Sequence, residues 1–254
     1  MTALSRLARV FAAFPAVVGL VLGVAGSAFA GSYAVQPSTF TLVPPERNAT
    51  MTLTNLSSEP IRLQVSGVAW SENENGTMLL TRAPGIVIFP QFFTIPALGT
   101  QVVRAAVVTP LSTTEQTFRI VIEDMPPLGE IVHAAPGMRI SMRTRFTLAV
   151  YVEPALPAPS SRIEDVRVRE GVLTFAVRNT GNTHLAGASL SVDGRDASGR
   201  SVFSKSVNDW HVLAGERHVY AFNLGTATCS RNLTISLGAG AVPPAQTFDV
   251  AACQ

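Results

Sequence analysis

The chain has 254 residues, with 19 basic and 17 acidic side chains, a formal net charge of +2 and 47% hydrophobic residues. This nearly neutral balance does not support binding to nucleic acid or to an anionic membrane surface. The length suits one large domain or two small ones.

Residues 1–30 have the organisation of a secretory signal. Arg6 and Arg9 form a basic start, an apolar run follows, and Ala-Phe-Ala at 28–30 forms an A-x-A cleavage site. The alternative is a membrane anchor, because the apolar run is nearly long enough to span a bilayer. Pro15 and the small residues at the end of the run favour cleavage. We therefore expect an exported protein that is not inserted in a membrane once the signal is removed.

After residue 30, short segments of alternating apolar and polar residues are separated by Gly, Pro, Asn and Ser, and helical periodicity is almost absent. Turn signals at such short intervals predict an all-β fold of antiparallel sandwiches rather than alternating strands and helices. The clearest strand segments are residues 50–56, 61–70, 85–90, 101–108, 172–179, 188–194 and 233–238.

The segment "EPALPAPSS" (153–161) divides the chain. Its three prolines exclude a central strand and are typical of a linker. The sequence therefore predicts two domains, at residues 31–155 and 160–254, each near the size of an immunoglobulin-like domain.

Two internal similarities occur in the same order in both halves. "MTLTNLSSEPIRL" (51–63) resembles "LTFAVRNTGNTHL" (173–185), because each has a strand, an Asn, a small polar turn and a second strand. "PALGTQVVRAAVV" (96–108) resembles "VLAGERHVYAFNL" (212–224), because each has a turn with Gly before an alternating strand. The repeats indicate two related domains but say nothing of function.

The two cysteines, Cys229 and Cys253, both lie near the C-terminus. In an exported chain they meet an oxidising compartment, so we expect one disulfide that closes a 25-residue segment. There is no Cys-x-x-Cys pattern, so we expect no redox catalysis by this pair.

The sequence contains no recognisable set of catalytic residues. It has neither a G-x-S-x-G elbow nor a phosphate-binding loop. Glu123 and Asp124 are adjacent, so on a strand they point to opposite faces and cannot act as a carboxylate pair. No two histidines have the spacing of a helical metal site, so we expect no metal, no cofactor and a binding protein rather than an enzyme. The histidines are His133, His184, His211 and His218.

The stretch "FRIVIEDMPP" (118–127) reads as a core strand that ends abruptly. Phe118, Ile120 and Ile122 share one parity, and the two prolines that follow lack the backbone N–H needed to extend a sheet. A loop is expected at residues 128–137 because it contains two Gly and a Pro.

The next segment, "MRISMRTRFTLAVYVEP" (138–154), predicts an unusually long strand. Three arginines lie on one parity, and the other parity is apolar, with Met138, Ile140, Met142, Phe146 and Leu148. One interpretation is a final strand whose arginines are solvated and protect an exposed edge. The other is a strand that pairs with another chain, with apolar side chains on one parity inserted into that partner.

Taken in order, these segments resemble the periplasmic chaperones of the chaperone–usher pathway of pilus assembly. The similarity extends into the second half through "VLAGERHVYAF" (212–222) and a late Cys, and so covers nearly all of the chain after the signal. The residues that carry it are Pro90 with Phe92 and Phe93, Gly99 with Gln101, Val103 and Arg104, the Glu123–Pro127 strand end, and the long basic and apolar strand.

This resemblance implies two immunoglobulin-like domains arranged as an L, and a periplasmic location. Pilus subunits of this pathway lack their last strand, and the chaperone inserts its own strand into the open groove, a donor-strand complementation. The implied partners are pilus subunits and an outer-membrane usher. The donor side chains expected here are Met138, Ile140, Met142 and Phe146.

One part of the family pattern is missing. In the best-known branch, a first-strand arginine and a last-strand lysine bind the terminal carboxylate of the subunit. Here residues 33–45 contain no basic residue, and the lysine position holds Thr147, or Arg145 after a two-residue shift. The segment 148–154 is also longer than its counterpart in that branch. Both features are more similar to the archaic branch. Our candidates for the carboxylate anchor are Arg145 and then Arg104.

Two other functions compete with this interpretation. A structural or adhesive surface protein of two β-sandwiches would need an alternating apolar N-terminal extension, and residues 31–40 are short and weak for that role. A secreted hydrolase would need a catalytic set, which the sequence does not offer.

Overall fold

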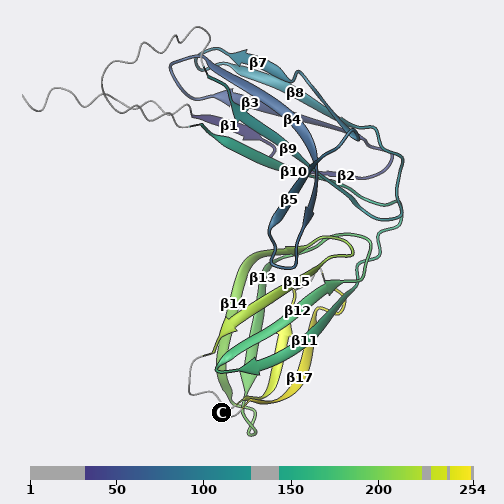
Figure 1. Cartoon of the computed structure of the whole chain (residues 1–254), viewed down its shortest axis with the longest axis vertical. Helices are drawn as coiled ribbons and strands as arrows, with labels where there is room; N and C mark the ends of the chain where they lie inside the picture. The colour runs from purple at the N-terminus through teal and green to yellow at the C-terminus, as the bar shows by residue number, and fades with distance from the viewer. Residues whose placement is uncertain (1–31, 127–142, 225–229, 239–240, 253–254) are drawn as a thin grey trace, which may run out of the picture.

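The computed structural model describes residues 32–126, 143–224, 230–238 and 241–252 (Figure 1). Within these ranges every regular element is a β-strand, and none of the described segments forms a helix long and apolar enough to cross a membrane. The strands form four sheets, which pair into two sandwiches that meet at an angle (Figure 1). The predicted fold, all-β with two immunoglobulin-like sandwiches arranged as an L, is confirmed.

The first sandwich is built from two sheets. One has the order β1 (Tyr33–Gln36), β3 (Asn48–Asn55), β8 (Thr100–Val107), β6 (Ile86–Phe89). The other has the order β2 (Thr39–Leu42), β10 (Arg145–Val152), β9 (Gln116–Asp124), β4 (Ile61–Glu72), β5 (Met78–Arg82), and β7 (Phe92–Ile95) also pairs with β4.

The second sandwich also has two sheets. One has the order β11 (Ser161–Arg169), β12 (Val172–Asn179), β15 (Arg217–Asn223). The other has the order β14 (Ser201–Val212), β13 (Leu185–Arg195), β16 (Ser230–Ser236), β17 (Ala245–Ala252). No strand forms at residues 153–160, which connect the two sandwiches. The domain boundaries 31–155 and 160–254 remain the division that we propose.

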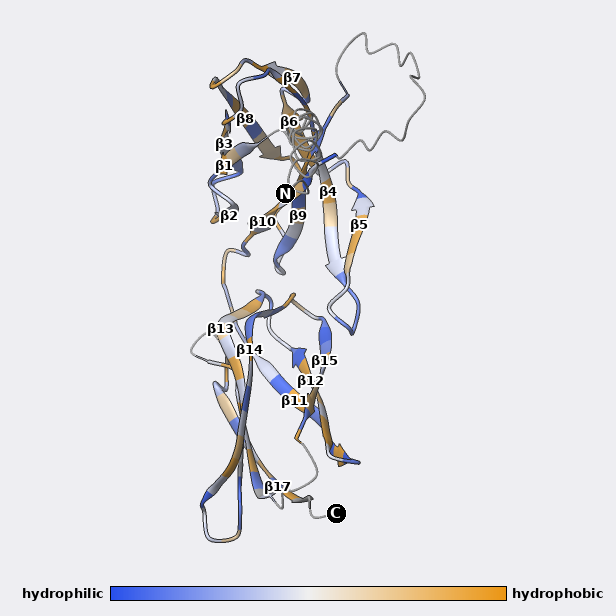
Figure 2. Ribbon diagram, turned by 90° about the vertical axis from the view of Figure 1, so that its left-hand side faces the viewer, coloured by the Kyte–Doolittle hydropathy of each residue, from blue (hydrophilic) through white to orange (hydrophobic). Residues whose placement is uncertain are grey.

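Each sandwich has its own core, formed by alternate residues of facing strands. Phe118, Ile120 and Ile122 are buried in the first core, as their shared parity predicts. Phe175 and Ile235 are buried in the second. Figure 2 shows hydrophobic residues (orange) alternating with hydrophilic ones along strands of both sandwiches. This alternation is what two sheets packed face to face require.

The internal repeat seen in the sequence corresponds to a buried asparagine. In the first sandwich the side-chain amide of Asn55 donates to the backbone carbonyls of Glu59, Ile95 and Pro96, at 2.8, 3.3 and 2.9 Å. The backbone N–H of Asn55 donates to the carbonyl of Gly99 at 2.9 Å. Asn55 therefore joins the end of β3 to the turn before β8.

Asn179 makes the matching contacts in the second sandwich. Its amide donates to the carbonyls of Thr183 and Val212, at 2.7 and 3.0 Å, and its backbone N–H donates to the carbonyl of Glu216 at 2.9 Å. The end of β12 is thus joined to the turn before β15. By this correspondence Glu216 occupies the place that Gly99 holds in the first sandwich.

Candidate functional site

Strand β10 is a sheet edge along half of its length. It pairs with β9 from Arg145, opposite Glu123, to Val152. It pairs with β2 only from Ala149 to Val152. Among the residues that the structure describes, the segment from Arg145 to Leu148 therefore has a backbone partner on the β9 side alone. Both interpretations of this segment, an edge protected by arginines and a strand that pairs with another chain, expect such an edge.

Phe146 continues the row of core residues on β10 but is exposed. Leu148, Val150 and Val152 share its parity and are buried in that core. Phe146, by contrast, is 47% exposed, and its ring contacts only the edge of Tyr33 among the aromatic neighbours described, with centroids 5.4 Å apart. An exposed Phe in line with core residues marks a place where a further apolar group could be buried.

The three other predicted donor residues, Met138, Ile140 and Met142, lie outside the described residues, as do Cys229 and Cys253. Their roles stay predictions. Residues 1–30, the predicted signal, also lie outside the described part.

Arg145, the first candidate for the carboxylate anchor, already has an acidic partner. Its Nε lies 3.3 Å from the carboxylate of Glu123, and both side chains are exposed. Arg143, Arg145, Glu123 and Asp124 line one shallow pocket beside this pair. Two basic and two acidic groups balance there, so the pocket has no excess positive charge.

Arg104 lies in the opposite sheet. It is on β8, between Thr50 of β3 and Phe89 of β6, and its side chain is exposed on the outer face because Val103 and Ala105 point into the core. The structure therefore does not bring Arg104 and Arg145 together.

The sequence analysis missed a third arginine, Arg119. It lies on β9 between Ala149 of β10 and Val68 of β4, and its guanidinium is centred 3.7 Å over the ring of Trp70. Its Nε is buried and has no hydrogen-bond partner among the described residues. Burial lowers the pKa of Arg119, although Tyr151 and Glu72 act in the opposite direction. The sequence did contain a signal for Arg119, because it is a basic residue in the middle of the core strand "FRIVIEDMPP".

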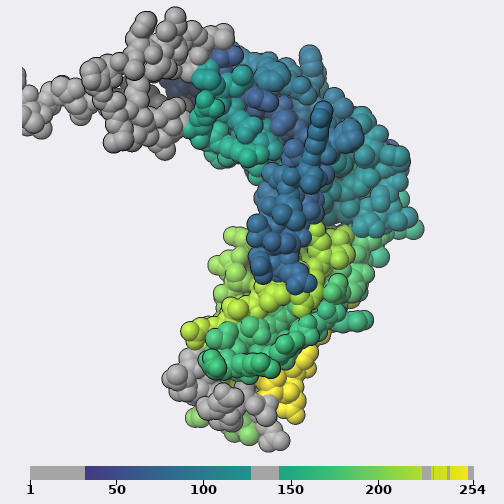
Figure 3. All heavy atoms as spheres, in the orientation of Figure 1, coloured from purple at the N-terminus to yellow at the C-terminus, as the bar shows by residue number. Residues whose placement is uncertain are grey.

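The two sandwiches meet where the β4–β5 hairpin leaves the first one. In Figure 3 this hairpin (blue) rests against strands of the second sandwich (yellow-green). A small apolar cluster fills the junction. It contains Trp70 and Leu80 of the hairpin, Ala149 and Tyr151 of β10, and Leu213, which follows β14.

At the end of β4, two histidines of the second sandwich contact one buried glutamate of the first. Nε2 of His211 is 2.6 Å from Oε1 of Glu72, and Nε2 of His218 is 3.1 Å from Oε2. Burial raises the pKa of Glu72, but the two imidazoles outweigh it and hold that pKa at about 2. Glu72 is therefore a carboxylate at neutral pH.

A third histidine of the second sandwich, His184, forms a similar contact with a glutamate of the first. Nδ1 of His184 is 2.8 Å from the carboxylate of the buried Glu115. The ring of His184 stacks on Tyr151 with centroids 4.0 Å apart. The sequence analysis tested these histidines only for helical spacing, and so missed that strands and turns bring three of them to one junction.

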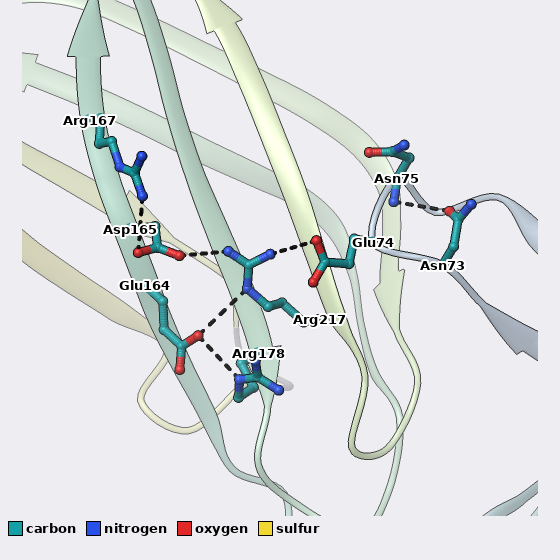
Figure 4. A network of polar contacts seen from close by, with 8 residues as sticks. All are labelled: Asn73, Glu74, Asn75, Glu164, Asp165, Arg167, Arg178 and Arg217. Atoms are coloured by element: carbon teal, nitrogen blue, oxygen red, sulfur yellow. Dashed lines mark hydrogen bonds and ion pairs between the residues drawn. The ribbon is translucent and has the colours of Figure 1, made fainter.

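A partly buried ion-pair network joins the tip of the hairpin to the second sandwich (Figure 4). Arg217 lies between Glu74 of the hairpin, at 3.0 Å, and Asp165 of β11, at 2.7 Å. Glu164 is 3.7 Å from Arg217 and 3.2 Å from Arg178, which extends the network to β12.

Comparison with known families identifies the first sandwich. Residues 32–156 match the model for the N-terminal domain of PapD, a pili and flagellar-assembly chaperone. The chain belongs to the pilus-assembly chaperones. This family consists of chaperones, which is a class without enzymatic activity. No curated protein matched the sequence.

Solved structures of other chaperones share the fold over most of the chain. The class 5 fimbriae chaperone CfaA is 14% identical, with a TM-score of 0.57, over 86% of this chaperone and 98% of CfaA. The structure of CsuC with CsuE, from the archaic Csu pili of Acinetobacter baumannii, is 15% identical with a TM-score of 0.54. The match covers 86% of this chaperone and 97% of the solved chain. The structure of the Salmonella enterica SafB chaperone with the SafA pilin is 14% identical with a TM-score of 0.51. The match covers 87% of this chaperone and 98% of the solved chain. Identities this low establish the fold alone.

Proposed function

We propose that this chaperone binds pilus subunits in the periplasm by donor-strand complementation and delivers them to an outer-membrane usher. The observation that carries the proposal is the edge of β10 from Arg145 to Leu148, which includes the exposed Phe146 and has no backbone partner opposite β9 among the described residues. The CsuC and SafB structures hold those chaperones with a tip subunit and a pilin, which supports subunits as partners here too.

Residues 138–148 are the donor segment in this proposal. Met138, Ile140, Met142 and Phe146 would enter the groove of a subunit that lacks its last strand. Each buried side chain contributes roughly 1.5–3 kcal/mol, and the free edge of β10 adds backbone hydrogen bonds to the subunit. Covering the groove also removes an apolar patch and two open strand edges that favour aggregation.

The chaperone fits the archaic branch in this proposal because β1 and β2 offer no basic residue for the carboxylate of the subunit. The anchor then has to come from elsewhere. Arg145 remains a candidate, but Glu123 already neutralises it, and Arg104 is on the outer face of the other sheet. Arg119 has an unpaired Nε, and its ring contact with Trp70 lies beside the junction. We therefore add Arg119 as the best-placed candidate.

Co-expression with the cognate subunit tests the donor segment. Replacing Met138, Ile140 and Met142 by Ser is expected to remove the subunit from the soluble periplasmic fraction, because its groove stays open. Val87→Ser is the matched control, since Val87 is 50% exposed on β6 in the opposite sheet. A subunit that stays soluble and bound to the triple variant would rule out donor-strand complementation.

Binding measurements with single variants test the anchor. Arg119→Gln is expected to weaken the affinity for the subunit by more than about 10-fold, the cost of leaving a half-buried carboxylate without its cation. Arg104→Gln should have no effect. The loss should vanish when the subunit has an amidated C-terminus. If Arg145→Gln weakens binding in this amide-sensitive way and Arg119→Gln does not, Arg145 is the anchor and our choice is wrong.

A further inference from the structure

Three buried polar atoms at the junction of the sandwiches converge on one point. They are Oε2 of Glu72 on β4, Oε2 of Glu216 in the turn before β15, and Nε2 of His218 on β15. We propose that these three atoms bind a divalent transition-metal ion such as Zn²⁺ between the two sandwiches. This goes beyond the proposed binding of subunits and does not depend on it.

The distances suit a small ion. Nε2 of His218 is 3.1 Å from Oε2 of Glu72 and 4.0 Å from Oε2 of Glu216, and all three ligand atoms lie within 4.8 Å of one another. Zn²⁺ binds imidazole nitrogen and carboxylate oxygen at about 2.0–2.2 Å in a tetrahedron, which places two ligand atoms about 3.3–3.5 Å apart. Oε2 of Glu216 is farther from His218 than this range, so it would have to move closer when an ion binds.

The same three atoms lack hydrogen bonds. Neither Oε2 atom nor Nε2 of His218 has a hydrogen-bond partner among the residues that the structure describes. The side chains of Glu72 and His218 are only 2% and 6% exposed. Although Nε2 of His218 and Oε2 of Glu72 are 3.1 Å apart, they are not in hydrogen-bond geometry. Buried polar atoms left in this way are costly, and a shared cation satisfies all three.

The other oxygen of each carboxylate is already held. Oε1 of Glu72 accepts a hydrogen bond from His211 at 2.6 Å. Oε1 of Glu216 accepts one from the backbone N–H of Glu72 at 3.0 Å. Each glutamate is thus fixed through one oxygen and presents the other toward His218. Metal ligands in proteins are typically oriented by such outer hydrogen bonds, and His211 takes that positioning role here.

The ligand set and its access favour a transition metal. Ca²⁺ needs six to eight oxygen ligands, and imidazole is a ligand of Zn²⁺, Cu²⁺ or Ni²⁺ rather than of Ca²⁺ or Mg²⁺. A pocket lined by Gly76, Trp210, His211 and His218 opens beside the two imidazole rings. It is the side from which an ion would reach His218.

Bound there, the ion would connect Glu72 of the first sandwich to two residues of the second. It would therefore stabilise the angle between the sandwiches. The sequence-based expectation of no metal site rested on helical spacing, and this cluster is formed instead by a strand of one sandwich and a turn and strand of the other.

Titration of untagged, metal-free chaperone tests the site, with Co²⁺ as a spectroscopic probe and Zn²⁺ followed by calorimetry. We expect one ion per chain, a Co²⁺ visible spectrum without a thiolate charge-transfer band, and a higher unfolding temperature with Zn²⁺. Glu216→Gln and His218→Gln should abolish binding, and His211→Gln should weaken it by about 10–100-fold. His184→Gln is the control, because His184 lies at the same junction but outside the cluster.

The wild-type titration decides the question even if a variant does not fold. Absence of one-to-one binding in the wild type would overturn the proposal. Glu72, Glu216 and His218 would then interact only through ion pairs and shared protons. A thiolate band, or unchanged binding in a folded Glu216→Gln variant, would also overturn it.

Discussion

Buried polar residues in this chaperone fall into two groups that differ in how fully their atoms are paired. The amides of Asn55 and Asn179 donate to backbone carbonyls at the ends of strands, so burial of each is compensated. Glu72 and His218 are also buried, but among the described residues each keeps one atom without a hydrogen bond. Residues of the first group stabilise the fold, and those of the second are available to bind an ion.

The asparagines give a prediction about stability. Asn55→Ala and Asn179→Ala should each lower the free energy of unfolding by about 2–3 kcal/mol, because two or three buried carbonyls lose their donor. Urea unfolding followed by circular dichroism measures the change. Asn208→Ala is the control, since Asn208 is exposed on β14 and should cost less than about 0.5 kcal/mol. Equal effects at the three positions would contradict the role given to the repeat.

At the scale of elements, β10 has two functions along one strand. From Ala149 to Val152 it is an inner strand between β9 and β2, and these residues are buried. From Arg145 to Leu148 it is an edge. The inner half fixes the register of the edge half, so the apolar parity of Leu148 continues through Phe146 into the donor segment that we propose.

The β4–β5 hairpin is the second element with a role at the junction. Arg217→Gln removes the contacts of this arginine with Glu74, Glu164 and Asp165. We expect faster amide hydrogen exchange at the hairpin tip, residues 73–77, because it loses its tie to the second sandwich. Arg200→Gln is the control, because the exposed Arg200–Asp196 pair lies within a single turn of the second sandwich. Unchanged exchange in the Arg217 variant would show that the apolar cluster alone holds the hairpin.

At the scale of the whole molecule, local patterns predicted more than long-range ones. The strands, the two cores and the repeat around Asn55 and Asn179 follow from alternation and turn residues, which act between near neighbours. The junction does not: Glu72 meets His211 across 139 positions and Glu216 across 144. No period in the sequence encodes such pairs, because they depend on the angle between the sandwiches. Arg119 was missed for a different reason, because its place beside Trp70 depends on how β9 pairs with β4 within the first sandwich.

Hydrogen exchange of the chaperone with and without its cognate subunit shows whether the subunit pairs with residues 138–148. Peptides that cover residues 138–148 should become strongly protected in the complex, because the free edge of β10 gains a backbone partner. Peptides from β6 and β14 should exchange as in the free chaperone. If residues 138–148 exchange equally in both states while the subunit is bound, the subunit does not pair with this strand and donor-strand complementation is contradicted.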